Sequence, residues 1–128
     1  MKLSTRKKGN LAEEKALDFL KKRGFEILEK NFRTPWGEID LIAKKGKILC
    51  FIEVKSASSD PGIVPEEKVN FTKQNKISKV AEFYILKNSK NLSKIKEIRF
   101  DVIVINWAKD EVKHYESAFY TEKITSEI

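Results

Sequence analysis

Apolar residues recur with two periods along this chain, one typical of helices and one typical of strands. Helical spacing predicts two helices, near residues 8–23 and 71–87. Short apolar runs bounded by glycine, proline and polar residues predict strands. These runs cover residues 25–32, 39–43, 48–55 and 97–106, and residues 108–119 are predicted to form a last hairpin through Lys109 and Asp110. The elements therefore follow the order helix, strand, strand, strand, helix, strand.

The first predicted helix carries an acid among its apolar residues. On a helical wheel, Glu13 lies between Leu17 and Leu20 in the apolar arc. Glu14 lies on the opposite side. An acid at the position of Glu13 either meets a partner in the interior or, from the edge of the arc, extends to solvent or pairs with a lysine, and the pattern leaves both open. Gly24 is expected to end this helix, because glycine adopts the left-handed C′ conformation freely.

Charged residues interrupt two strands that are otherwise apolar. Asp40 follows Ile39 in one strand, and Glu53 and Lys55 end the other. Side chains alternate along a strand, so Glu53 and Lys55 share one face. A loop with an even number of residues, such as 44–47, places Asp40 on that same face, about 4.5–8 Å from Glu53. We therefore expect a cluster of two carboxylates and one ammonium.

Such a cluster is costly among apolar residues. A buried charge loses much of its solvation unless it is paired or bound to a metal, and two neighbouring carboxylates repel each other. A divalent cation removes both costs, and carboxylate oxygens suit Mg²⁺ or Mn²⁺. Asp40 and Glu53 are thus candidate metal ligands, and Lys55 is a candidate for activating water or stabilising charge on a phosphate. The alternative is an incidental ion cluster at the end of a strand.

Three further features border this cluster in sequence. Lys73, on the apolar side of the second helix, either reaches a phosphate or a site acid or keeps its ammonium group in water. Residues 56–65, with two prolines and a glycine, form either a substrate-facing loop or a plain connector. Asp101, inside the apolar strand 97–106, is expected to be a structural acid with satisfied hydrogen bonds.

Composition and charge narrow the class of protein. The 128 residues suffice for one domain, over residues 1–120, followed by a loose tail over 121–128. A formal net charge of +7 and a pI near 9.4 favour an anionic partner such as nucleic acid, although a lysine-rich surface that only aids solubility is the alternative. The single cysteine, Cys50, excludes a disulfide within the chain. The basic start leads into no apolar segment and no apolar run could span a membrane, so we expect a cytoplasmic protein without a membrane partner.

Several short motifs follow one another in a fixed order along the chain. They comprise Gly9, Glu13 and Ala16; Gly24, Asn31 and Arg33; Gly37 to Ile42; Phe51, Glu53, Val54 and Lys55; and Lys73. This ordered set, over roughly residues 5 to 105, resembles the YraN-like family of predicted bacterial endonucleases. That family belongs to the PD-(D/E)xK nuclease superfamily and is similar in pattern to Holliday-junction resolvases.

The resemblance implies a restriction-endonuclease-like α/β fold with a central mixed sheet flanked by helices, in the order αβββαβ. It also implies metal-dependent hydrolysis of phosphodiester bonds in DNA, with branched or structured DNA as a candidate substrate. The implied catalytic residues are Asp40, Glu53, Lys55 and Glu13. Asp40, Glu53 and Glu13 would hold Mg²⁺ or Mn²⁺, with Glu38 as a further candidate. The candidate contacts to nucleic acid are Lys73, Arg33, Lys7, Lys8, Lys44 and Lys45.

The sequence departs from the family pattern at two places. Ile39 stands where the superfamily name has proline, and Ser56 and Ala57 follow Lys55 where the family usually has an arginine two positions on. The second departure leaves the grip on the substrate near Lys55 open. A nucleic-acid-binding module that keeps the fold without cutting is therefore the alternative function. The sequence also leaves open whether the protein forms a homodimer.

Overall fold

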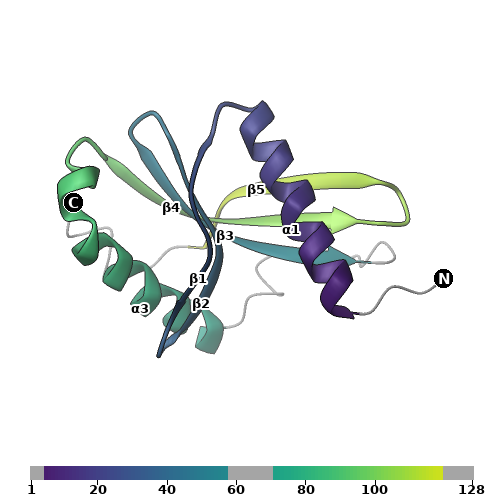
Figure 1. Cartoon of the computed structure of the whole chain (residues 1–128), viewed down its shortest axis with the longest axis horizontal. Helices are drawn as coiled ribbons and strands as arrows, with labels where there is room; N and C mark the ends of the chain where they lie inside the picture. The colour runs from purple at the N-terminus through teal and green to yellow at the C-terminus, as the bar shows by residue number, and fades with distance from the viewer. Residues whose placement is uncertain (1–4, 58–70, 120–128) are drawn as a thin grey trace.

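A computed structural model of the chain describes residues 5–57 and 71–119, and within this part five strands form one mixed sheet (Figure 1). For residues 5–9 and 71 only the backbone is described. The elements in chain order are α1 (Thr5–Lys22), β1 (Glu26–Thr34), β2 (Gly37–Lys45), β3 (Ile48–Ala57), α3 (Phe71–Lys87), the 3₁₀ helix η1 (Ser89–Leu92), β4 (Glu97–Asn106) and β5 (Glu111–Phe119).

The strands lie side by side in the same order as they occur in the chain. β1, β2 and β3 pair antiparallel, β3 and β4 pair parallel, and β4 and β5 pair antiparallel. Parallel neighbours need a crossover connection, and α3 lies within it. The predicted α/β fold with a central mixed sheet flanked by helices is therefore confirmed, and it is compatible with a restriction-endonuclease-like fold.

Each face of the sheet has its own apolar cluster under one of the helices. Val80 of α3 packs on the face that includes Phe51 of β3. Ala16 of α1 packs on the other face, which includes Ile52 of the same strand. Phe51 and Ile52 are both almost completely buried, as expected of a strand covered on both faces. In Figure 1, α3 and α1 lie on either side of β1 and β2.

The sheet divides near the middle of β2. The pairing of β2 with β3 runs from Lys45–Ile48 and ends at Leu41–Ile52. Beyond that point β2 continues beside β1, whereas β3 continues beside β4 as far as Ala57. Figure 1 shows β2 turning away while β3 runs on in another direction. We call the region between residues 37–40 of β2 and 53–57 of β3 the fork.

Most predicted elements lie where the apolar pattern placed them. α3 and β4 have the predicted bounds, and α1 begins three residues earlier and ends one residue earlier than predicted. Gly24 follows α1 with a φ of 88°, in the left-handed region that favours glycine.

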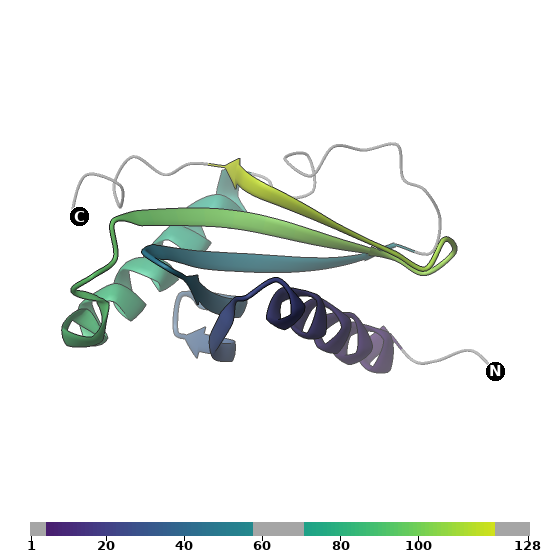
Figure 2. The same ribbon diagram turned by 90° about the horizontal axis from the view of Figure 1, so that it is seen from above.

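The predicted hairpin through Lys109 and Asp110 is confirmed as the connection between β4 and β5. Its second arm is a full strand of the sheet, so the structure adds β5 to the predicted order αβββαβ (Figure 2). The predicted tail over 121–128 and most of the predicted loop 56–65 lie outside the described residues. Neither α1 nor α3 combines the length and the apolar character that crossing a bilayer would need.

Candidate metal centre

Asp40 holds the two strands together where the fork begins. It lies one residue beyond the last pair of β2 with β3. Its Oδ2 accepts a hydrogen bond of 2.8 Å from the backbone N–H of Val54. Burial raises the pKa of the Asp40 carboxyl, although this hydrogen bond and the charge of Lys73 oppose the rise. The carboxylate therefore takes the place of a missing strand partner for the Val54 N–H.

Two other carboxylates lie beside that of Asp40. One oxygen each from Glu13, Glu38 and Asp40 lie within 4.8 Å of one another, and all three residues are half-buried. Glu13 comes from α1, whereas Glu38 and Asp40 come from β2. Burial and the charges of Asp40 and Glu38 raise the pKa of the Glu13 carboxyl. Of the two alternatives left open by the sequence, the structure places Glu13 next to the acids of β2.

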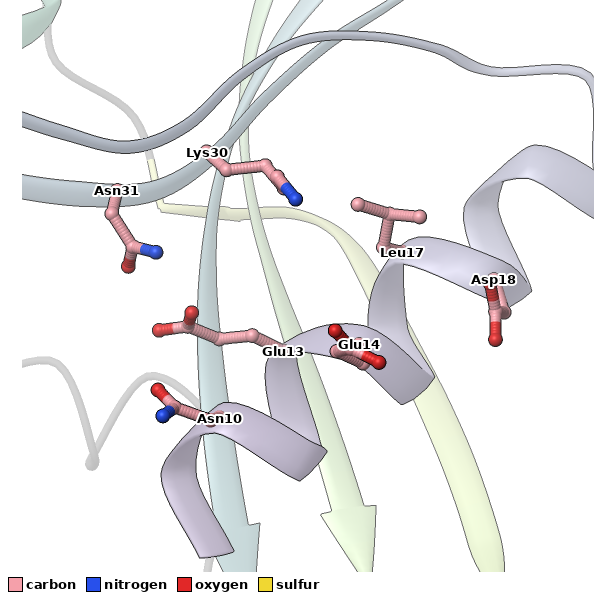
Figure 3. A pocket seen from close by; sticks show the side chains of 7 residues that line it. All are labelled: Asn10, Glu13, Glu14, Leu17, Asp18, Lys30 and Asn31. Atoms are coloured by element: carbon pink, nitrogen blue, oxygen red, sulfur yellow. The ribbon is translucent and has the colours of Figure 1, made fainter. Parts of the chain in front are cut away.

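Asn31 of β1 positions Glu13 from the other side. Figure 3 shows the Glu13 side chain reaching from α1 toward Asn31, with which it forms a side-chain hydrogen bond. Asn31 has a φ of 51°, which asparagine tolerates better than most residues. A cavity of about 360 Å³ lies beside this contact, lined by Asn10, Glu13, Glu14, Leu17, Asp18, Lys30 and Asn31. Sequence reasoning matched Asn31 to a motif but did not foresee this contact.

Glu53 is buried at the base of the fork with an incomplete set of partners. Its side chain is 6% exposed, and its Oε2 lies 3.1 Å from Nζ of Lys73. Its Oε1 is buried without a hydrogen-bond partner among the described residues. Burial, followed by the charge of Asp40, raises the pKa of the Glu53 carboxyl to about 7. A buried carboxylate oxygen without a partner destabilises the folded state unless another group binds it.

Two lysines complete the ionisable cluster in the fork. Lys73, at the start of α3, reaches the site acid Glu53, which was one of the alternatives the sequence allowed. Burial and hydrogen bonding to Lys73 lower the pKa of the half-buried Lys55 ammonium. Burial alone would lower the pKa of Lys73. Hydrogen bonding to Lys55 and the charge of Glu53 have the larger effect, so the pKa of Lys73 is raised. Of the two amines, Lys55 therefore gives up a proton more readily.

The donor set fits a hard divalent cation. Carboxylate oxygens are the ligands that Mg²⁺ and Mn²⁺ prefer, and two or three of them suffice when waters fill the other positions. Glu13, Glu38 and Asp40 form the group with ligand spacing. Glu53, whose Oε1 has no hydrogen-bond partner among the described residues, is close enough for the charge of Asp40 to raise its pKa. The sequence paired Asp40 with Glu53. In the structure Asp40 also meets Glu13 and Glu38, while Glu53 contacts Lys73.

The basic residues predicted to bind nucleic acid lie in different places. Arg33 pairs through Nε with Glu38 at 2.9 Å, next to the three carboxylates. Lys44 lies 3.5 Å from Glu26, and Lys45 lies over the ring of Phe25. Lys44 and Lys45 end β2 roughly 13–17 Å along the strand from Asp40. Lys7 and Lys8 fall in the first turns of α1, where side chains are not described.

Asp101 forms a separate ionic network with residues of β4 and β5. It is fully buried and accepts hydrogen bonds from Arg99, from the backbone N–H of Ser117 and from His114, whose Nε2 lies 2.8 Å away. Burial alone would raise the pKa of this carboxyl, but these hydrogen bonds outweigh it and lower the pKa. The prediction of a satisfied structural acid is confirmed.

Comparison with known proteins identifies one family. The sequence profile of the Uncharacterised protein family UPF0102 matches residues 12–105, most of the chain. The chain belongs to the UPF0102 family. That stretch contains Glu13, the acids of β2, and the charged end of β3, so the whole candidate site lies within the part that the family shares.

Individual UPF0102 relatives cover nearly the same length. A UPF0102 protein of Thermodesulfovibrio yellowstonii is 49% identical over 112 residues, covering 88% of this chain and 95% of that protein. One from Clostridioides difficile is 41% identical over 117 residues, covering 91% and 100%. The solved structure of Pyrococcus furiosus SfsA in complex with Ca²⁺ covers 88% of this chain and 64% of its own, at 16% identity and a TM-score of 0.30, too low a likeness to support a conclusion.

Proposed function

We propose that this UPF0102 protein is a divalent-metal-dependent endonuclease that hydrolyses phosphodiester bonds in DNA. The observation that carries the proposal is the meeting of Glu13, Glu38 and Asp40 at the fork, next to the buried Glu53 and Lys55. Structural acids inside a sheet have satisfied oxygens, as Asp101 does. The acids of the fork repel one another and leave an oxygen unpaired, an arrangement that a bound cation stabilises.

The carboxylates would hold Mg²⁺ or Mn²⁺, with Asp40 between the Glu13–Glu38 side and the Glu53 side. When bound, such an ion polarises a phosphoryl oxygen and lowers the pKa of a coordinated water. Asp40 is fixed by the Val54 N–H, and Glu13 by Asn31, so both carboxylates are oriented before a cation arrives. Preorganised ligands of this kind favour a defined coordination geometry.

Lys55 and Lys73 divide two tasks between them. Lys73 remains charged and holds Glu53 in place through its 3.1 Å contact. Lys55, whose pKa is lowered by burial and by Lys73, accepts a proton from the attacking water or stabilises charge on the phosphate. The net charge of +7 adds a general attraction for a polyanion such as DNA.

A cleavage assay with matched variants tests the proposal. Linear duplex, single-stranded, flapped and four-way-junction DNA would be incubated with Mg²⁺ or Mn²⁺ at one stated salt concentration. The wild type is expected to cut at least one of them, and Asp40→Asn and Lys55→Met to cut none. Glu14→Gln is the control, because Glu14 is exposed on α1 next in sequence to Glu13.

The same assay separates the alternative function. DNA binding by a wild type that cuts none of the substrates with either metal would replace the proposal with a nucleic-acid-binding module. Lys55→Met is expected to leave binding close to wild type, because groups that act only on the transition state change rate rather than affinity. Loss of binding and cutting together in that variant would assign Lys55 to substrate affinity instead.

A further inference from the structure

An exposed aromatic patch borders the fork. Of the four large apolar side chains that are exposed in the described part of the chain, three gather here: Trp36 at 48%, Phe83 at 37% and Leu86 at 67%. Trp36 occupies the turn between β1 and β2, and the other two lie on α3. We call these three residues the aromatic patch. A hollow of about 250 Å³ lies among them, and Lys79 and Glu82 complete its lining.

The rings of the aromatic patch are held in position from below. Trp36 and Phe83 lie with ring centroids 5.7 Å apart and tilted by 52°. Phe83 contacts Phe32, which packs edge to face against the buried Tyr84. Contacts between aromatic rings thus run from the core to the surface. The hydroxyl of Thr34 accepts a hydrogen bond from the Trp36 backbone and fixes the turn. A rigid exposed ring loses little conformational freedom when another flat group stacks on it.

The aromatic patch is continuous with the candidate metal centre. Trp36 precedes Glu38 by two residues, about 7 Å along an extended strand. On α3, Lys76, Lys79 and Phe83 follow Lys73 at spacings of three or four residues, which places them on one stripe of the helix. The stripe begins where Lys73 contacts Glu53 and ends at the exposed ring of Phe83.

The charges around the aromatic patch match a polyanion. Lys76, Lys79 and Lys87 are exposed on α3, and Nζ of Lys87 lies 5.9 Å from the centre of the Phe83 ring. Glu82 adds one acid at the rim. An aromatic ring among lysines is the combination with which proteins bind unpaired nucleotides, because bases stack on the ring while ammonium groups contact phosphates. A stable contact between two copies would involve about 20–30 residues a side, far more than three apolar side chains.

We infer that the aromatic patch binds an unpaired nucleotide of the DNA substrate by stacking a base on Trp36, while the lysines of α3 hold the adjoining phosphates. This inference rests on the proposed function, because the turn that carries Trp36 leads directly into residues 37–40 of the fork. It adds a substrate class: DNA with a single-stranded stretch next to the site of cleavage.

Tryptophan fluorescence can test the inference without any cleavage. The chain has two tryptophans, so Trp107→Phe leaves Trp36 as the only reporter. In EDTA and at low salt, oligothymidylate is expected to quench this fluorescence more than duplex DNA does. Trp36→Ala is expected to weaken binding of oligothymidylate by roughly tenfold or more. Its duplex affinity should stay near wild type, and Trp36→Phe should recover part of the loss because phenylalanine also stacks.

Leu11→Ala is the matched control, since Leu11 is an exposed apolar side chain of α1 that lies outside the aromatic patch. It should leave binding of oligothymidylate unchanged. Equal oligothymidylate binding by wild type and Trp36→Ala would overturn the inference, and so would an equal loss for single-stranded and duplex DNA. Light scattering adds another decisive result: a wild-type dimer that both Trp36→Ala and Leu86→Ala dissociate would make the patch a contact between copies.

The two proposals fail separately. Stacking on Trp36 in EDTA by a protein that never cuts DNA would keep this inference and remove the nuclease. Metal-dependent cutting with no role for Trp36 in binding would keep the nuclease and remove the inference.

Discussion

Two buried acids in neighbouring strands have opposite surroundings. Asp101 of β4 is fully buried, yet it has Arg99, His114 and a backbone N–H as partners, and these lower its pKa. Glu53 of β3, whose side chain is 6% exposed, has one ion pair and one orphaned oxygen, and its pKa is raised to about 7. The two acids are therefore buried to a similar degree, but they differ in how many hydrogen-bond and ion-pair partners they have. A satisfied acid stabilises the fold, whereas an unsatisfied one is suited to a ligand that comes from outside.

Removing Asp101 should give the largest change in stability. Asp101→Asn leaves the mostly buried guanidinium of Arg99 without its main partner, and breaking a buried pair in this way costs about 3–5 kcal/mol. Urea unfolding, followed by circular dichroism, measures the difference. The lowered pKa of Asp101 also means that its contribution is present above the ordinary pKa of an aspartate and is lost as the pH falls. A change below about 1 kcal/mol would contradict this account of the network.

Removing the charge of Glu53 should act in the opposite direction. Its pKa rises from 4.5 to about 7 on folding, so the folded state binds more protons between these values and stability falls as the pH rises through them. At pH 8 without metal, Glu53→Gln should therefore stabilise the protein by about 2–3 kcal/mol. Unfolding curves of both proteins from pH 4 to 8 check this. A wild-type stability that rises over this range, with no gain in the variant, would show that Lys73 alone satisfies Glu53.

A cation should supply the partner that the fork lacks. At a concentration of Mn²⁺ or Mg²⁺ ten times its dissociation constant, stability should rise by about 1.4 kcal/mol through mass action. Asp40→Asn and Glu13→Gln should reduce this rise, whereas Glu14→Gln should keep it. Thermal unfolding with and without metal gives the measurement. An equal rise in all four proteins would place metal binding elsewhere on the chain.

The smallest change in stability is expected for an exposed ion pair. Lys44 and Glu26 lie 3.5 Å apart at the surface, with side chains 35% and 65% exposed. Water and salt screen such a pair, so Glu26→Gln should change stability by less than about 0.5 kcal/mol. The same urea titration applies. A loss comparable to that of Asp101→Asn would mean that exposure does not separate the two kinds of pair.

The sequence was sufficient for elements whose apolar period is strong. α3 and β4 have apolar residues at consistent spacing over their full length, and their bounds were predicted. The alternation of β3 likewise indicated that Glu53 and Lys55 share a face, and both interact with Lys73. Local periodicity suffices there because each face of the strand packs against one continuous apolar layer.

The fork could not be predicted, because it depends on where strand pairing stops. Sequence reasoning placed Asp40 beside Glu53 by extending the hairpin register. The pairing ends at Leu41–Ile52, and a hydrogen bond from the Val54 N–H keeps the Asp40 carboxylate next to β3, where its charge raises the pKa of Glu53. The left-handed conformation of Asn31, which accompanies its contact with Glu13, is set by tertiary packing. So is the direction in which the long Lys73 side chain extends. Neither follows from a pattern of apolar residues.

The two-residue turn at Gly46 has a consequence for how the chain folds. It connects the pair Lys45–Ile48, and Gly46 has the positive φ, 59°, that a type II′ turn asks of its first central residue. Hairpins with such short loops form within about 1–10 μs, whereas the parallel pairing of β3 with β4 must wait for a crossover that includes α3. The hairpin therefore sets its register early, and a slip of one residue would turn Glu53 and Lys55 to the opposite face. Gly46, at the far end of the hairpin, thus helps to fix the register in which Glu53 and Lys55 both face Lys73.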